Sequence, residues 1–197
     1  MPRTKAFDVN TVLASAQDLF WKKGYAATSI GDLEKHTGIS RSSLYQTFGG
    51  KRQLYDRTLA VYQEDNQQRL RSALLNVTNL RRALTDLFYG AAAQHAPECV
   101  SSARGCYIVA ATTELAPTCT DAFRFVAENR QKFVFLLQDA LARAQEQGEL
   151  LKEASVEDLA NYLFICYNGL QVVVQTDIER KALARAVQVG VDALPWA

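Results

Sequence analysis

The sequence predicts an all-α protein with a three-helix helix-turn-helix domain at its N-terminus and a larger helical domain behind it. Apolar residues recur at steps of three and four along most of the chain, which is the spacing of one helix face. No strand-like alternation of useful length interrupts this pattern. Ser, Asp, Gly and Pro residues stand between the periodic segments, where helices begin and end.

Composition sets the broad class. The chain has 197 residues, of which 48% are hydrophobic, and this is ample for a packed core. It contains no run of about 18 apolar residues and no apolar signal region near its start, so we expect a cytoplasmic protein with no membrane partner. Its four cysteines form no CxxC pair, which favours reduced thiols over a disulfide framework. These cysteines are Cys99, Cys106, Cys119 and Cys166.

Positive charge is concentrated at the front of the chain. Residues 1–57 hold nine Lys or Arg and five Asp or Glu, a net charge of +4, whereas the whole chain carries only +1. A basic front on a mildly acidic body is expected when only one end meets phosphate. An imbalance of this size also arises by chance on a solvated surface.

The first helix should begin at Asp8 and end at Gly24. Asp8 can cap the first backbone N–H groups, and Phe7 can pack on Val12 one turn further on. Two lysines precede Gly24, and cations suit the C-terminal end of a helix. This helix is interpreted as scaffold with a basic end.

Residues 28–48, TSIGDLEKHTGISRSSLYQTF, predict two short helices joined by a tight turn. Thr28 or Ser29 caps the first of them, and Asp32 completes a capping box with Ser29. Gly38 ends that helix and Ser40 caps the next, which fits the short Gly-containing connection of a helix-turn-helix.

The side chains of this segment suit a DNA surface. Free N–H groups at a helix start bind phosphate, and Gln can pair with adenine while Ser is tolerant of several bases. Tyr hydroxyls can donate to phosphate, and Arg can reach guanine or phosphate. The candidate DNA-binding residues are Tyr25, Thr28, Ser29, Arg41, Ser42, Ser43, Tyr45, Gln46 and Lys51. Read alone, the same residues are also compatible with an ordinary solvated helix.

The segment GYAATSIGDLEKHTGISRSSLYQTFGGKRQLY resembles the N-terminal signature of the TetR/AcrR family of transcriptional regulators. The shared order is an aromatic after Gly, a Thr-rich helix start, a Gly in the turn, a Leu-Tyr pair, a Phe and a Lys at the next helix start. The resemblance implies an all-helical dimer with a DNA-binding domain and a ligand-binding, dimerising domain. Gln46 stands where the family often has His, and Gly49 and Gly50 replace a commoner Pro or Ser.

Beyond Lys51 the pattern remains helical. The domains are expected at residues 1–52 and 53–197, joined through a fourth helix over 51–75 instead of a flexible tether. Further helices are expected at 80–95, 105–115, 123–147, 156–174 and 178–194. The last two have broad apolar faces and small residues, which favours a homodimer interface, as the family resemblance also implies. A monomeric core is the alternative.

The second domain holds more aromatic residues than a minimal helix bundle needs, which is compatible with an apolar pocket for a small-molecule inducer. Aromatic residues at helical spacing are, however, more often part of the core than of a ligand site. The pocket candidates are Phe88, Cys106, Tyr107, Phe133, Phe164 and Tyr167. Cys106 follows Arg104 and Gly105 at a helix start, where a thiolate is favoured, so it is a candidate sensor of electrophiles. A small buried thiol is the competing interpretation.

No enzyme, metal or cofactor is predicted. The chain has no phosphate loop, GxSxG or HExxH motif, and only two histidines. His95, Cys99 and Cys106 lack the spacing of a structural zinc site.

The sequence therefore predicts a ligand-responsive regulator, most simply a repressor that a small molecule or electrophile releases from a palindromic operator in double-stranded DNA. The alternative is a helical small-molecule-binding or adaptor protein in which the helix-turn-helix is structural.

Overall fold

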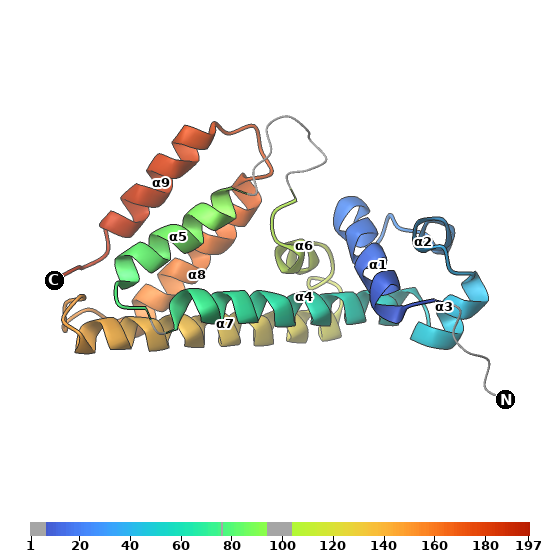
Figure 1. Cartoon of the computed structure of the whole chain (residues 1–197), viewed down its shortest axis with the longest axis horizontal. Helices are drawn as coiled ribbons and strands as arrows, with labels where there is room; N and C mark the ends of the chain where they lie inside the picture. The colour runs from blue at the N-terminus through green and yellow to red at the C-terminus, as the bar shows by residue number, and fades with distance from the viewer. Residues whose placement is uncertain (1–6, 76, 94–103) are drawn as a thin grey trace. The chain divides into compact units, whose positions relative to one another are not determined.

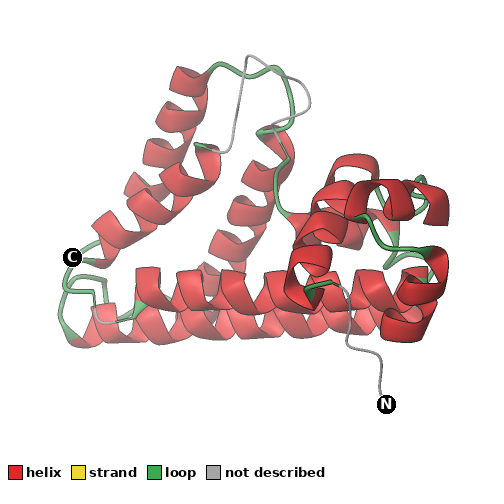
Figure 2. Cartoon of the chain, turned by 45° about the vertical axis from the view of Figure 1, so that its right-hand side comes forward, coloured by secondary structure: helices red, strands yellow, loops and turns green. Residues whose placement is uncertain are grey.

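The computed structural model describes residues 7–75, 77–93 and 104–197, and within these ranges it contains nine helices and no strand (Figure 2). The all-α prediction is confirmed. None of the helices in these ranges is long and apolar enough to cross a bilayer. The helices are α1 (Val9–Lys23), α2 (Ile30–Thr37), α3 (Arg41–Phe48), α4 (Lys51–Leu74), α5 (Leu80–Ala92), α6 (Tyr107–Glu114), α7 (Thr120–Glu146), α8 (Val156–Val173) and α9 (Arg180–Asp192).

The chain divides into two compact units, Met1–Glu64 and Asp65–Ala197. The division falls inside α4, so this one helix contributes residues to both units. The functional boundary expected at residue 52 stays a prediction.

The first unit is built on α1, α2 and α3, labelled in Figure 1. Helix α1 packs on α2, and α2 packs on α3. Phe20, Leu33 and Leu44 are almost completely buried between them, as their three- and four-residue spacing predicts. Trp21 on α1 meets Tyr62 on α4 edge to face, with ring centroids 5.1 Å apart.

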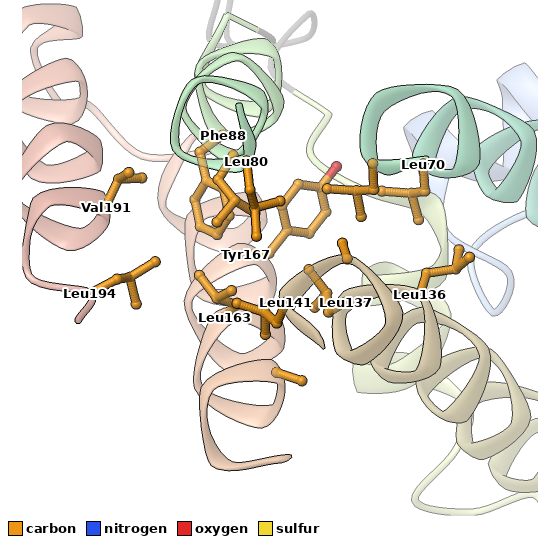
Figure 3. Close-up of a cluster of buried hydrophobic side chains, with 14 of the residues drawn as sticks. Leu70, Leu80, Phe88, Leu136, Leu137, Leu141, Leu163, Tyr167, Val191 and Leu194 are labelled. Carbon is orange, nitrogen blue, oxygen red and sulfur yellow. The ribbon is translucent and has the colours of Figure 1, made fainter. Parts of the chain in front are cut away.

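The second unit places α5 against both α8 and α9, while α8 packs on α7 (Figure 1). Its main buried cluster includes Leu70 and Leu74 from the C-terminal half of α4, of which Leu70 is labelled in Figure 3, and Ala92, Val174 and Leu183 form a separate smaller cluster. Arg143 on α7 donates to the Leu74 carbonyl at 3.0 Å, which fixes the end of α4. The core thus draws on helices far apart in sequence.

A distant carboxylate caps α5. Glu149, which follows α7, accepts hydrogen bonds from the backbone N–H groups of Leu80 and Arg81 at 2.7 and 2.8 Å. Asn79 accepts from the Arg82 N–H at 2.7 Å. Three donors at the start of α5 are therefore satisfied, and the negative charge suits a helix N-terminus.

The segment entering α6 requires a glycine. Gly105 has φ +58° and lies so close to α8 that an added Cβ would stand 2.2 Å from the Gln171 carbonyl oxygen. No side chain fits in that space, and the left-handed backbone is itself unfavourable for other residues. Helix α6 packs on α7 and α8 from this anchored start.

The C-terminal segment folds back onto the turn between α7 and α8. Leu151 N–H donates to the Pro195 carbonyl at 2.9 Å, and the Trp196 indole N–H donates to the Val191 carbonyl at 2.8 Å. Arg81 lies over the Trp196 ring, 5.8 Å from its centroid. Trp196 is therefore fixed inside the second unit.

Candidate nucleic-acid interface

Helix α3 presents a polar face supported by a buried one. Leu44 and Phe48 are 0% and 3% exposed, and they seat the helix in the first unit. Arg41, Ser42, Tyr45 and Gln46 are exposed on the other side. A short helix with a firm apolar base and protruding polar side chains has the form of an element that enters a major groove.

The hydroxyls at the start of α3 are joined to one another. Ser40 caps the helix by accepting from the Ser43 N–H at 3.3 Å, and its hydroxyl lies 3.0 Å from those of both Ser42 and Ser43. Ser42 is exposed and Ser43 is half-buried. The hydroxyl of Ser43 accepts from Ser40 and keeps its own hydrogen for a further partner such as a base edge.

Glu34 is a positioning residue that the sequence did not reveal. Its carboxylate accepts a hydrogen bond from the Arg41 backbone N–H, the first residue of α3. The contact joins α2 to the start of α3 and satisfies one of the backbone N–H groups that have no partner within α3. The only indication of this role in the sequence was an acidic residue seven positions before the start of a helix. With a carboxylate already present there, the N-terminus of α3 is poorly suited to a phosphate.

The predicted capping box at the start of α2 is confirmed. The Ser29 hydroxyl accepts from the Asp32 N–H at 3.1 Å, and the Asp32 carboxylate accepts from the Ser29 N–H at 2.8 Å. The Lys23 ammonium stands 2.6 Å from the same carboxylate. Hydrogen bonds from Lys23 and Ser29 hold the pKa of Asp32 well below its usual range.

Thr28 lies beneath the surface. Its side chain is 0% exposed, and its hydroxyl donates to the Gly24 carbonyl at 2.6 Å. Its backbone N–H donates to the Tyr25 carbonyl at 3.3 Å. In the free protein Thr28 joins the end of α1 to the start of α2, whereas Ser29 beside it is exposed.

Tyr25 and Lys51 form a second polar group, at the start of α4. The Lys51 ammonium lies 4.3 Å from the centroid of the Tyr25 ring, a cation–π contact. The ring also meets Tyr55 edge to face at 4.9 Å. Both Tyr25 and Lys51 are half-buried, so the cation is held at the surface by an aromatic support.

The pocket candidates of the second unit fall into two groups. Phe133 meets Phe164 and Tyr167 edge to face at 5.7 and 5.1 Å, and Tyr167 meets Phe88 at 5.6 Å. These four rings pack against one another, as Figure 3 shows for Phe88 and Tyr167. The others, Cys106 and Tyr107, are buried at the start of α6.

Burial dominates the surroundings of Tyr167. It raises the pKa of the phenol to about 12, with a further contribution from the nearby Cys106. Cys106, Cys119 and Cys166 form no disulfide within the described residues. His95 and Cys99 lie outside the described residues, so the geometry they share with Cys106 is not described.

Comparison with known proteins identifies the family. Residues 12–58 match the model for bacterial regulatory proteins of the tetR family. An HTH-type transcriptional regulator of Bacillus subtilis, YezE, is 31% identical over 196 residues, covering 98% of this chain and 100% of that protein. The chain belongs to the tetR family. It is a transcriptional regulator and not an enzyme.

Two further similar proteins agree with the assignment. ComR, a transcriptional repressor of Escherichia coli, is 29% identical over 171 residues, which are 86% of this chain and 80% of ComR. A cysteine variant of the regulator CifR bound to 26-base-pair operator DNA has a TM-score of 0.86 and 27% identity, with 98% of this chain and 100% of CifR covered. The tetR-family fold therefore spans both units of this chain.

Proposed function

We propose that this chain is a dimeric, cytoplasmic repressor that reads operator DNA with α3 and leaves it when a small molecule enters the second unit. The observation that carries the DNA-binding part is the exposed polar face of α3 above the buried Leu44 and Phe48. CifR, similar over almost its whole length, is bound to operator DNA in its structure.

The proposed contacts separate into two roles. Tyr25, Ser29, Tyr45 and Lys51 contact phosphates, because they offer hydroxyls or an ammonium at the surface. Ser42, Ser43 and Gln46 read base edges, and Arg41 reaches a base or a phosphate. Thr28, the remaining candidate, contacts a phosphate only if DNA draws its hydroxyl away from Gly24.

Salt dependence distinguishes these roles. Lys51→Ala should weaken binding to all DNA sequences and reduce the slope of log affinity against log salt by about 0.9. Gln46→Ala should keep that slope and relax the preference at one base position, with a loss of about 1–3 kcal/mol on the preferred site. Fluorescence anisotropy over a salt series measures both. Lys181→Ala, an exposed cation in the second unit, is the control.

An unchanged slope in Lys51→Ala would remove Lys51 from the phosphate contacts. Unaltered DNA retention in Lys51→Ala, Tyr45→Phe and Gln46→Ala together would contradict the proposed role of α3.

The proposed dimer face is the outer side of α8 and α9. Ile165 and Val189 are 67% and 69% exposed, and Tyr162 is 45% exposed. Tyr162, Val189 and neighbouring residues line a groove of about 440 Å³ whose walls are largely apolar. Exposed apolar surface of this kind is covered in an oligomer, and a second copy of α8 and α9 would complete a four-helix bundle.

The oligomeric state tests this face. Ile165→Glu should yield monomers in analytical ultracentrifugation, because a charge buried at the centre of the interface is strongly unfavourable. Phe135→Glu, an equally exposed apolar site on α7, is the matched control. A dimeric Ile165→Glu variant would refute this interface.

The proposed mechanism couples a ligand to the spacing of the two DNA-binding units. Ligand entry shifts α6, α4 moves with it, and the two copies of α3 lose the separation of about 34 Å, or a multiple of it, that successive groove faces demand. Ligand binding then lowers the affinity for DNA, and DNA binding lowers the affinity for the ligand by the same factor. Identical small-angle scattering with and without inducer would contradict this mechanism.

Cys106 offers a second way to trigger the same change. Its position at the start of α6 supports a reactive thiol, whereas its burial, with 8% exposed, supports a packing role. Cys106→Ser should abolish DNA release by a quinone or an aldehyde if the thiol is the sensor. Release equal to wild type would leave Cys106 as a core residue.

A further inference from the structure

Two consecutive glycines join α3 to α4. Gly49 ends α3 with φ +91°, and Gly50 follows with φ +140°, so both adopt backbone conformations that favour glycine. The Gly50 carbonyl accepts from the Leu54 N–H at 3.0 Å, which makes Gly50 the capping position of α4. A glycine at this position offers no side chain to the first backbone N–H groups of the helix.

The side chain of Gln53 lies over this glycine pair. A Cβ added to Gly49 would meet the Gln53 Cγ atom at 3.5 Å, and a Cβ added to Gly50 would meet its Oε1 atom at 3.3 Å. The same added Cβ at Gly50 would meet the Tyr45 ring at 3.4 Å. The amide of Gln53 and the ring of Tyr45 therefore converge on one point, at the end of α3.

The amide of Gln53 is available to a further partner. Gln53 and Tyr45 are both exposed, and the Gln53 side chain makes no hydrogen bond with another described residue. Its two N–H groups are donors. An unused donor is thus held beside a side chain of the candidate DNA surface.

A carboxylate would be the ordinary choice at this position of a helix. Gln53 is the third residue of α4, and the helix dipole favours a negative charge there. Helices α2 and α8 carry Asp32 and Asp158 at their third positions, whereas the first turn of α4 contains no acidic residue. Glutamine keeps the length and shape of glutamate without its charge. This choice gives up stabilisation of α4, and it is expected where a carboxylate would face a polyanion.

We propose that Gln53 is a further DNA contact, and that its amide donates a hydrogen bond to a phosphate oxygen on the strand that Tyr45 contacts. This contact rests on the proposed DNA-binding function and adds a residue to the predicted set. Gly50 makes the arrangement possible, because a side chain there would press on both the Gln53 amide and the Tyr45 ring.

Substitutions of Gln53 distinguish a phosphate contact from a structural role. Gln53→Glu should weaken binding of the full chain to a fluorescein-labelled duplex of mixed sequence at least tenfold, because the carboxylate would face a phosphate. The same variant without DNA should unfold at a higher urea concentration than wild type, because the carboxylate suits the start of α4. The two effects have opposite signs only if Gln53 faces DNA.

The salt dependence of binding supplies a second measurement. Gln53→Lys should strengthen binding and steepen the slope of log affinity against log salt by about 0.9, because an ammonium displaces one more counterion. Gln53→Ala should weaken binding about fivefold and leave the slope unchanged, because a neutral hydrogen bond is lost. Gln131→Glu and Gln131→Lys, at an exposed position on α7, make the same changes of charge and should match wild type.

Three results would overturn the proposal. One is an undiminished affinity in Gln53→Glu, and another is an unchanged salt slope in Gln53→Lys. The third is a Gln53→Glu variant that is less stable in urea as well as weaker on DNA, which would assign Gln53 to the fold. If Lys51→Ala lowers the slope as expected while the Gln53 variants match wild type, this contact alone is refuted. A wild-type chain that does not bind the duplex refutes the DNA-binding function itself.

Discussion

Replacement of Gly105 by alanine should destabilise the second unit beyond the ordinary cost of a left-handed alanine. The added Cβ would stand 2.2 Å from the Gln171 carbonyl oxygen, and ordinary contact begins at 3.4 Å, so the two segments must separate by about 1.2 Å. The left-handed conformation costs about 1–2 kcal/mol, and overpacking of this kind costs about 1–3 kcal/mol more. The expected loss is therefore about 2–5 kcal/mol.

Gly148→Ala is the matched control. Gly148 lies in the same unit with φ +74°, and an added Cβ meets nothing within 4 Å. This variant should lose only about 1–2 kcal/mol from the free energy of unfolding. Urea denaturation followed by circular dichroism compares the two variants. Equal losses would show that the approach of Gly105 to α8 is not tight in solution, and would remove the direct link between Gln171 and α6.

Three further predictions concern charged and polar contacts. Glu149→Ala should cost about 1–2 kcal/mol in urea denaturation because it leaves two N–H groups of α5 uncapped, while Glu146→Ala, an exposed neighbour, should cost less than about 0.5 kcal/mol. The lowered pKa of Asp32 means that its carboxylate stabilises the fold above about pH 4, and this stabilisation is lost as the pH falls further. Asp32→Asn should therefore make the free energy of unfolding depend less steeply on pH below about pH 4. An unchanged pH dependence would contradict the capping box in solution. The Tyr167 pKa is raised to about 12, so this group favours the folded state most below about pH 10 and loses that contribution as the pH rises through 12. Tyr167→Phe should make the free energy of unfolding depend less steeply on pH above about pH 10. If an ultraviolet titration of this variant still shows a phenol that ionises near pH 12, the raised pKa belongs to another tyrosine.

The helix boundaries were predictable because their causes are local. Ser29 and Asp32 lie three residues apart and satisfy one another, and Gly38 takes the left-handed conformation that ends α2. Ser40 caps α3 in the same way. Signals of this kind are complete within one turn of chain, so no knowledge of the remaining fold was required.

Contacts between distant segments were not predictable. The carboxylate of Glu149 caps α5 from a position 69 residues after Leu80, and no pattern near α5 calls for it. The approach of Gly105 to Gln171 likewise joins two elements whose packing is decided by the whole core. Tertiary packing decides which distant residues meet, and the residues next to a helix end do not show which partner it will have.

The candidate sites show the same division. The polar face of α3 followed from helical spacing, because Leu44 and Phe48 indicate which side is inward. The aromatic residues of the second unit were found by composition, yet composition did not show that the rings pack on one another. Nothing in the sequence indicated that Gln171 is buried, because the burial of one glutamine within an apolar helix depends on how the other helices pack.

The positions of Trp21 and Trp196 give each unit its own optical signal. The chain has two tryptophans, one packed on Tyr62 near the middle of α4 and the other bonded to the Val191 carbonyl in the second unit. With one indole replaced by phenylalanine, the emission of the other reports the melting of a single unit. Because α4 runs unbroken through the division at Glu64, coincident or separate melting then measures how much folding cooperativity one continuous helix transmits.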